Sequence, residues 1–428
     1  MTYKIITLGC KVNEYESEVM SSLLENHGYT KSETPDVAIV NTCTVTNTAD
    51  SKSRKMIRSI RKKYPNAILV VCGCMIQNKN HLDIDADIII GNQKKTEIVN
   101  FIKEYKNEQI NVIDDMENAE FENMSLNNFD LTRAYIKIQD GCDNYCAYCI
   151  IPYVRGHVRC KKKEIVLNEA KQLIKNGHEE LVLTGIHTGN YHDGNYNFAD
   201  LLNDLVKLEG LKRLRISSVE ITELNDKVLD VVKNSKILVN HMHIPLQSGS
   251  NEILKQMNRK YNKEYFINKI KKIKEIKNDM NITTDVIVGF PGETEELFNE
   301  TVDTINKIGF TKIHVFPYSD REGTKASKMN NKVNGTIKKE RVKKLLEISK
   351  QNEIKYMKSH LEKVITFIPE VYKDNYLIGH SSNYLLIKAK GNKQLHGKEV
   401  SVTAKKIEYP YLIGEICKNN WTNFINLL

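Results

Sequence analysis

Short apolar runs alternate with amphipathic segments over the first 120 residues of the chain. The runs are continuous and rich in β-branched residues, which is typical of strands buried on both faces of a parallel sheet. They are Lys4–Leu8, Val37–Val40, Ala67–Cys72 and Ile88–Gly91. Between them, Glu14–His27 and Ala49–Tyr64 repeat their apolar positions with helical spacing. Strands that alternate with helices predict a doubly wound α/β domain over residues 1–120.

A second set of strands and helices follows an acidic, Asn-rich stretch. Residues 112–130 have no apolar period and are predicted to be a linker or a mobile loop. The alternation then resumes, and it ends in a long basic helix over Lys338–Glu362. The predicted strands are Ala134–Gln139, Leu181–Leu183, Arg213–Ile216, His241–Ile244, Thr283–Val288 and Lys312–Phe316. Six parallel strands with intervening helices favour a partial (β/α) barrel over residues 121–362.

The pattern changes again in the last part of the chain. Five short strands are separated by turn residues such as Gly391 and Asn392. These strands are Val364–Val371, Tyr376–Ile378, Tyr384–Lys388, Glu399–Ile407 and Leu412–Ile416. They predict a small all-β barrel over residues 363–428. The expected fold is therefore of the α/β class, with this barrel as a third and C-terminal domain.

Composition limits the expected cellular location and binding partners of the protein. The chain is 40% apolar and has no run of 18 apolar residues, so we expect no membrane span. Its first residues lack the features of a signal peptide, which predicts a cytoplasmic protein. A formal net charge of +9 permits nucleic-acid binding without requiring it. Nine cysteines in a long chain without an export signal favour metal ligands or reactive thiols over disulfides.

Three of the cysteines, the first triad, occupy one loop after the predicted strand Ala134–Gln139. Cys142, Cys146 and Cys149 have the spacing C-x3-C-x2-C. Thiolates are soft ligands that suit iron–sulfur clusters, and three of them leave one iron of a [4Fe–4S] cluster open. A structural zinc site completed by a distant His or Cys is the alternative, although zinc sites more often pair C-x2-C units.

Three other cysteines, the second triad, each follow a predicted strand of the first domain. They are Cys10, Cys43 and Cys74. Ligands collect beyond the carboxyl ends of the strands of a doubly wound sheet, so these thiols are expected at one rim, where they would hold a second cluster. An isolated cysteine is more often a small buried apolar residue. That interpretation fits the remaining cysteines better, which are Cys72, Cys160 and Cys417.

The first triad and three segments after it resemble the radical SAM (S-adenosylmethionine) superfamily. Gly185–Gly189 follows the second barrel strand, Ser217–Glu220 follows the third, and Thr283–Thr294 resembles a late strand-and-glycine motif. The resemblance implies that the first triad holds a [4Fe–4S] cluster at which SAM is cleaved to a 5′-deoxyadenosyl radical. It also implies SAM contacts from Tyr148, Gly185, Ser218, Glu220, Gln247 and Val288. The alternative interpretation is that Tyr148 only packs against the loop and does not contact SAM.

Both triads, in this order, resemble the methylthiotransferase family, in which a cluster domain precedes a radical SAM barrel and a TRAM barrel. Thr7–Ser17 and Asn41–Thr46 resemble the branch that acts on threonylcarbamoyladenosine at position 37 of tRNA. The isopentenyladenosine branch typically has Gln-Met-Asn at Lys11–Asn13 and Arg at Thr46. The resemblance implies two [4Fe–4S] clusters, methylation of sulfur at the second triad, and delivery of a methylthio group to C2 of the adenine. The sequence identifies neither the electron donor nor the sulfur source.

Basic residues mark two surfaces that tRNA would contact. Lys55, Arg58 and Lys62 recur on one face of a predicted helix and would follow phosphates, although such a face is often only solvated. The terminal barrel carries a further set that suits RNA, namely Lys388, Lys390, Lys393, Lys398, Tyr409 and Tyr411. Four residues near the first triad are expected to meet the anticodon or the SAM carboxylate. They are Arg133, Arg155, His157 and Arg159.

Two other functions stay open on the sequence. One keeps the chemistry but changes the substrate to isopentenyladenosine-37 or to an aspartate of a ribosomal protein. The other is a non-catalytic iron–sulfur protein that binds RNA or senses redox state. The glycine and polar segments after the barrel strands favour an enzyme, because a sensor has no need of a SAM pocket.

Overall fold

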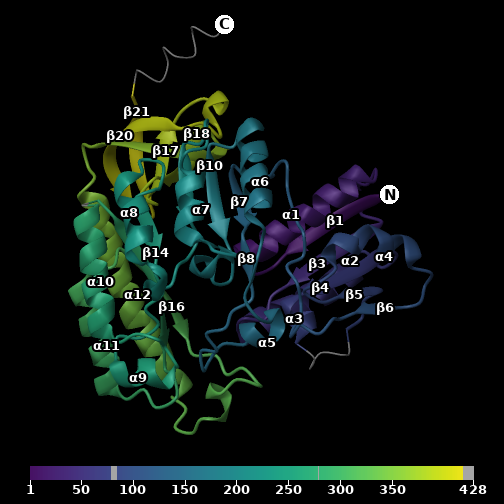
Figure 1. Ribbon diagram of the computed structural model, residues 1–428, viewed down its shortest axis with the longest axis horizontal. Coiled ribbons are helices and arrows are strands. Elements are labelled where there is room, and N and C mark those ends of the chain that lie inside the picture. Colours follow the sequence, from purple (N-terminus) through teal and green to yellow (C-terminus); the bar gives the residue numbers. More distant parts are fainter. Residues whose placement is uncertain (79–83, 278, 418–428) are drawn as a thin grey trace, which may run out of the picture.

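The computed structural model describes residues 1–78, 84–277 and 279–417. Its first domain is built on a six-stranded parallel sheet with the order β2-β1-β3-β4-β5-β6 (Figure 1). The strands are β1 (Thr2–Thr7), β2 (Thr30–Lys31), β3 (Val37–Thr42), β4 (Ile68–Gly73), β5 (Ile88–Ile90) and β6 (Ile110–Val112). The helices are α1 (Lys11–Asn26), α2 (Asn47–Lys63), α3 (Cys74–Gln77), η1 (Lys95–Glu97) and α4 (Ile98–Glu104).

Helices cover both faces of this sheet, which confirms the doubly wound prediction. Successive strand side chains point to opposite faces. Val37 and Ile39 of β3 accordingly pack with α1 and α4, whereas Ala38 and Val40 pack with α2 and α3. Because β1, β3 and β4 are neighbours, their carboxyl ends lie side by side at one edge.

The connector to the next domain is not the mobile loop that its composition suggested. It runs without regular structure, yet Met124, Leu126 and Phe129 are buried in the apolar core of the central domain. Thr96 of η1 donates a backbone and a hydroxyl hydrogen bond to Glu122, both at 2.7 Å. These contacts hold the connector against both domains.

The central domain is a partial barrel made of two parallel sheets, β13-β10-β7 and β14-β15-β16, as predicted. A single parallel bridge, Leu214 to Leu238, joins them. The strands are β7 (Arg133–Lys137), β10 (Glu180–Thr184), β13 (Arg213–Ile216), β14 (His241–His243), β15 (Asn281–Val288) and β16 (Lys312–Pro317). A small antiparallel pair, β8 (Gln139–Asp140) and β9 (Arg159–Cys160), flanks the first triad.

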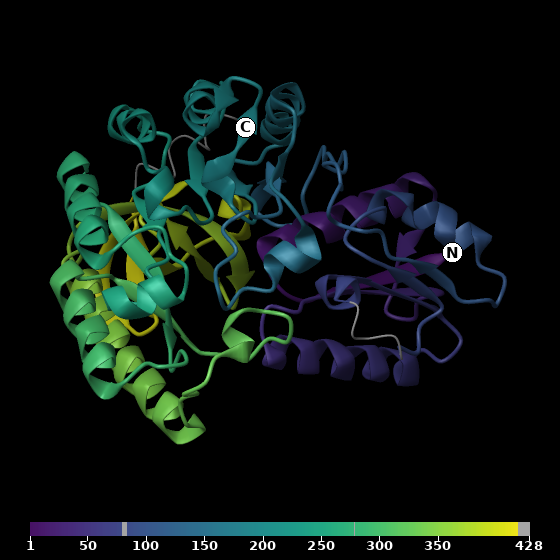
Figure 2. The same ribbon diagram turned by 60° about the horizontal axis from the view of Figure 1, so that its bottom comes forward.

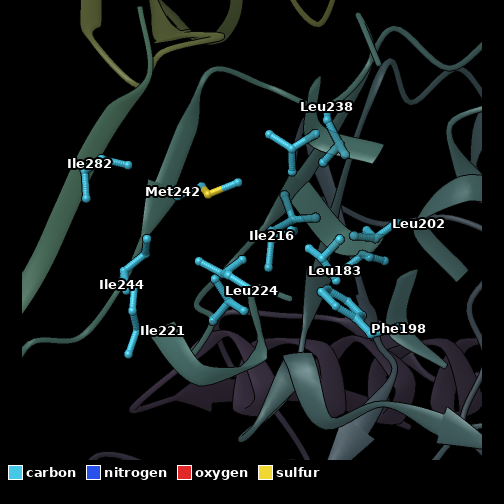
Figure 3. Close-up of a cluster of buried hydrophobic side chains, with 14 of the residues drawn as sticks. Leu183, Phe198, Leu202, Ile216, Ile221, Leu224, Leu238, Met242, Ile244 and Ile282 are labelled. Atoms are coloured by element: carbon cyan, nitrogen blue, oxygen red, sulfur yellow. The ribbon is translucent and has the colours of Figure 1, made fainter. Parts of the chain in front are cut away.

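Helices pack around the outside of these strands (Figures 1 and 2). They are α6 (Lys163–Lys175), α7 (Phe198–Leu205), α8 (Asp226–Asn234), α9 (Asn251–Gln256), α10 (Lys263–Ile276), α11 (Glu295–Ile308) and α12 (Gly335–Lys358). The short helix α5 (Ile151–Arg155) instead lies against α3 of the first domain. The shorter elements are η2 (Thr188–Asn190), β11 (His192–Asp193), β12 (Tyr196–Asn197), η3 (Ile221–Glu223) and η4 (Ala326–Lys328). Figure 3 shows the core that joins the two sheets, with Ile216 between Leu183 and Met242.

A closed five-stranded barrel with the order β17-β18-β19-β21-β20 ends the described chain, as expected for a TRAM barrel. Its elements are β17 (Val364–Lys373), β18 (Tyr376–Ser381), β19 (Leu386–Lys390), η5 (Lys393–Leu395), β20 (Val400–Glu408) and β21 (Tyr411–Ile416). Arg213, the first residue of β13, donates to Glu399 at 2.8 Å, and Arg133, the first of β7, donates to Glu370 at 2.9 Å. The barrel therefore packs against the amino ends of the central strands.

Residues 418–428 of the predicted third domain lie outside the described residues. Among the helices of the described chain, none is both long and apolar enough to span a membrane.

Candidate functional site

The second triad lies at one rim of the first sheet. Cys10 follows β1, Cys43 follows β3, and Cys74 is the first residue of α3, directly after β4. Gly9 makes the close approach of the first two loops possible. Its φ is +112°, and a Cβ atom at this position would lie 3.1 Å from Cys43 Sγ. The structure thus gathers three thiols from three neighbouring strand ends.

The setting of these thiols disfavours free thiolates. Cys43 and Cys74 are buried, whereas Cys10 lies exposed at the rim. Burial raises the pKa of Cys43 to about 11, with a further contribution from Cys74. A metal centre that takes the place of the thiol protons relieves this cost. Arg155 faces the same site and donates from Nε to Cys74 Sγ at 3.2 Å.

Arg155 belongs to a buried group of charges between the first and central domains. Its guanidinium donates to Glu16 at 2.9 Å, to Asp140 at 3.0 Å and to Asn13 at 2.8 Å. Lys137 also pairs with Glu16, at 2.7 Å. The buried cations are Lys95, Lys137, Arg155 and Arg159, and the buried acids are Glu16 and Asp140. Cations outnumber acids beside the second triad, which suits an anionic, thiolate-bound cluster.

The anticodon contact expected near the first triad is wrong for Arg155, and Arg133 and Arg159 lie beside acids of the protein. Arg155 is fully buried among these side chains and cannot reach an anticodon. Arg133 pairs with Glu370 of the C-terminal barrel. His157, by contrast, is exposed and pairs with Asp143 at 2.6 Å.

The first triad sits on the loop between β8 and α5. Cys142 N donates to Gly156 O at 3.0 Å, and Cys149 N donates to Cys146 O at 2.9 Å. Arg259 donates to Cys146 Sγ at 3.3 Å. Burial raises the pKa of Cys149 to about 12, and the neighbouring Cys146 adds to that shift. This donor set again suits a thiolate-bound cluster.

The two triads share one apolar cluster. Cys74 is buried in it with Ile150, Ile151 and Val154, and the side chains of Cys142 and Cys149 pack against its edge. In the described part of the chain, no three His, Cys, Asp or Glu side chains meet closely enough for a single metal ion. The thiolates of a [4Fe–4S] cluster bind separate irons and need no such convergence.

The residues predicted to contact SAM all lie at the carboxyl ends of the central strands. Gly185 follows β10, Ser218 and Glu220 follow β13, and Val288 ends β15. Glu220 pairs with Arg259, the residue that also donates to Cys146. A Cβ atom on Gly185 would lie 2.9 Å from Gln139 Oε1, so a larger residue here would require Gln139 to shift. The structure therefore places these residues on the same side of the barrel as the first triad.

Tyr148 and Gln247 line a pocket of about 200 Å³ between the first and central domains. Gln247 has a φ of +64°, and its buried Oε1 atom has no hydrogen-bond partner in the described structure. An unpaired acceptor in a pocket indicates a missing donor. The other lining residues are Val45, Thr46, Asp285, Ile287, Phe316, Pro317, Tyr318 and Ser319.

A loop after β16 completes this pocket, although no pattern in the sequence predicts it. Arg321 donates to Asp50 at 2.8 Å, to Asn47 at 2.7 Å and to Thr44 at 2.6 Å. Figure 2 shows this loop, in green, beside the N-terminal domain. Arg321 thereby holds the segment that follows Cys43 against the pocket. Its partners are far away in the chain, so no local spacing could have revealed them.

The predicted RNA-contacting residues of the first domain lie together on the outer face of α2. Lys55, Arg58 and Lys62 are exposed, whereas Ile57 and Ile60 of the same helix are buried. Arg58 and Lys62 also line a surface pocket of about 270 Å³. This arrangement leaves the charges available to a polyanion.

The C-terminal barrel presents a basic and aromatic face over adjacent strands. Lys388 Nζ lies 4.4 Å from the ring centre of Tyr376 and 5.6 Å from that of Tyr411. Tyr409 instead donates to Glu353, and Lys398 pairs with Glu179 at 3.7 Å. Of the predicted barrel set, Lys388 and Tyr411 share this face, and Lys390 lies on it too, in register with Tyr376.

Comparisons with known proteins found matches for both the first and the central domain. The radical SAM superfamily model matches residues 136–305, and that of uncharacterized protein family UPF0004 matches residues 2–91. The threonylcarbamoyladenosine tRNA methylthiotransferase MtaB of Bacillus subtilis (strain 168) is 42% identical over 96% of this chain and 95% of its own. A tRNA-2-methylthio-N(6)-dimethylallyladenosine synthase of Lachnoclostridium phytofermentans is 35% identical over 98% of this chain and 96% of its own. A solved radical SAM methyltransferase, TsrM from Kitasatospora setae, shares the fold with a TM-score of 0.55 at 13% identity over 74% of each chain.

Proposed function

This chain belongs to the radical SAM tRNA methylthiotransferase family, and we propose that it adds a methylthio group to C2 of N6-threonylcarbamoyladenosine at position 37 of tRNA. The observation that carries the proposal is the meeting of two cysteine triads at one apolar cluster, close to a pocket between the domains. The higher identity to a threonylcarbamoyladenosine enzyme than to a dimethylallyladenosine enzyme supports this nucleoside.

The two triads take different parts in this proposal. Cys142, Cys146 and Cys149 hold one [4Fe–4S] cluster, and the second triad holds another. When bound, the two groups supply one-electron cleavage of SAM at the first triad and a sulfur that can be methylated at the second. The apolar side chains of Ile150 and Val154 pack with cysteines of both triads.

The residues after the central strands orient SAM in this proposal. Gly185 leaves backbone groups accessible, Glu220 is held by Arg259 at the first triad, and Gln247 offers an unpaired acceptor. Tyr148 contributes an aromatic wall where the pocket meets the cysteine loop. The two remaining contacts are Ser218 and Val288. Their shared place at one end of the barrel supports a single SAM site.

The anticodon loop enters from the side of the pocket in this proposal. The exposed Phe316 and the neighbouring Tyr318 offer flat apolar surface for the base at position 37. The basic face of α2 and the Lys388 face of the barrel meet phosphates of the anticodon arm. Such contacts add affinity without adding sequence specificity.

Mass spectrometry of nucleosides from the tRNA of a deletion strain tests the function. We expect the 2-methylthio form of threonylcarbamoyladenosine to disappear and to return with the wild-type gene. A loss of the methylthio form of isopentenyladenosine would assign the other nucleoside. An unchanged nucleoside profile would refute a tRNA substrate.

A further inference from the structure

The inner face of the partial barrel in the central domain changes from polar to apolar along the strands. On β15, Thr283, Asp285 and Ile287 share one face because side chains alternate. Asp285 pairs in register with His314, and Ile287 pairs with Phe316 on β16. The level at the carboxyl end of the strands is therefore apolar and aromatic, and the level below it is polar.

The pocket between the domains reaches this polar level. Its walls include Ile287 and Phe316 of the upper level and Asp285 of the lower one. Two residues along a strand are about 7 Å apart. A base held between Ile287 and Phe316 would therefore direct a substituent of a few bonds toward Asp285 and His314.

Histidines dominate the polar level. His243 lies 3.2 Å from Asp285 Oδ1 and 3.0 Å from the hydroxyl of Thr283. The rings of His243 and His314 are 5.5 Å apart, and His314 is open to solvent. Below them, the buried His241 contacts Thr283 through Nε2, while its Nδ1 has no partner in the described structure. The level thus has hydrogen-bonding capacity that the protein does not use.

Lys11 adds a positive charge to this level from the first domain. It is the first residue of α1 and is half-buried. Burial is the main cause that lowers the pKa of His241, and the charge of Lys11 contributes to that shift. The side chain of Lys11 makes no hydrogen bond or ion pair with any residue that the structure describes.

The other cations around this level already have acidic partners. Arg215 pairs with Glu180 at 2.6 Å, and Lys312 pairs with Glu353 at 3.2 Å. Asp285 is matched by His243. Lys11 is therefore the charge that an incoming anion would neutralise.

We propose that this polar level binds the carboxylate of the N6 substituent of the target adenosine, and that Lys11 determines specificity for a substrate with such a carboxylate. The proposal rests on the proposed function and assigns recognition to residues of this chain. An apolar N6 substituent would bury Lys11 without a partner, which costs free energy. A carboxylate gives Lys11 an anionic partner.

Binding of anticodon stem-loop RNAs tests the proposal without turnover. Three RNAs carry threonylcarbamoyladenosine, its neutral methyl ester or isopentenyladenosine at position 37, and affinity is measured without reductant. A hydrogen bond to a charged group contributes about 1.5–3 kcal/mol, so Lys11→Met should weaken binding of the acid roughly tenfold to hundredfold. Binding of the ester and of the isopentenyl RNA should change less than threefold.

A second variant of the same level and a matched control complete the test. His314→Leu changes an exposed residue of the same level, and we expect the same preference shift with a smaller loss for the acid. Lys163→Met is the matched control, because Lys163 also opens a helix but lies at the surface, beside Glu164. It should leave all three affinities unchanged. Iron content, measured in parallel, reports whether Lys11→Met disturbs the neighbouring Cys10.

The outcomes separate the inference from the function. If Lys11→Met weakens all three RNAs equally, Lys11 contacts a phosphate and the inference is wrong. If it weakens none of them, the inference is wrong as well. Both results leave the function intact as long as the wild-type enzyme converts the threonylcarbamoyl RNA. A wild-type enzyme that converts only the isopentenyl RNA would overturn the function and the inference together.

Discussion

The two cysteine triads of this chain are built in opposite ways. The first triad occupies one loop, which has the local hydrogen bond from Cys149 N to Cys146 O and is supported from outside by Arg259. The second triad draws one thiol from each of three strand ends, so it exists only where β1, β3 and β4 pair and where Arg155 closes the site. A local site tolerates damage elsewhere in the fold, whereas an assembled site depends on all of its supports.

The largest expected effect separates the chemistry of the two triads. Cys146→Ala should abolish release of 5′-deoxyadenosine from SAM, because it removes a ligand of the first triad. Wild-type protein reconstituted without oxygen should hold about eight irons, and this variant about four, which the second triad retains. Cys43→Ala should show the converse, with SAM cleavage kept and methylthio transfer lost.

Iron analysis and chromatography of the SAM products check both variants. Persistent 5′-deoxyadenosine in Cys146→Ala would show that the radical site is assigned wrongly. A wild-type plateau near four irons would remove the second cluster from the proposal.

Removal of Arg155 should damage the assembled site more than the local one. Arg155→Met leaves Glu16 and Asp140 buried with fewer partners, and loss of one member of a buried ion network costs about 3–5 kcal/mol. It also removes the donor to Cys74. We therefore expect a lower urea midpoint and a loss of iron from the second triad, while the first triad still cleaves SAM.

Arg61→Met is the matched control in the same domain. Arg61 pairs with Asp87 at 2.9 Å near the far end of α2, partly exposed to water. Such a pair contributes about 1 kcal/mol or less. Equal losses of stability and iron in the two variants would contradict a special role for Arg155.

The same contrast explains what the sequence could predict. Strand ends are visible as apolar runs, so the pattern of these runs is enough to place the cysteines behind them at one rim. The closed terminal barrel follows from short strands and turns. Arg155 and Arg321 gain their roles from partners in the first domain, and no local period encodes such pairs. The burial of the connector could not be predicted for a different reason. Its apolar residues, Met124, Leu126 and Phe129, are too few in a polar stretch to form a period.

Backbone strain offers a smaller and more selective way to disturb the second triad. Gly73 directly precedes Cys74, has a φ of +100°, and a Cβ atom there would lie 2.6 Å from the carbonyl oxygen of Thr42. Gly73→Ala should cost more than the roughly 1–3 kcal/mol of an unfavourable backbone conformation alone. We expect iron to be lost from the second triad, with SAM cleavage preserved.

Gly177→Ala separates strain from crowding. Gly177 has a similar φ of +94° but no atom within 4 Å of the added Cβ, and it lies away from both triads. It should lower the free energy of unfolding slightly and leave the iron content unchanged. Loss of iron in both variants would mean that general destabilisation, not the position of Cys74, empties the site.

The smallest expected effect concerns the surface that leads to the second triad. Helix α2 begins shortly after Cys43, and its exposed Arg58 and Lys62 would meet two phosphates of the anticodon arm. Replacing both with Ala should weaken tRNA binding a few-fold at low salt and reduce the slope of log affinity against log salt by about 2. Replacing Lys103 and Lys106 with Ala changes the charge equally on another exposed segment and should have little effect. If the two pairs behave alike, net charge alone attracts tRNA. If only the α2 pair matters, tRNA lies across the domain of the second triad, and the assembled site is the one that the substrate covers.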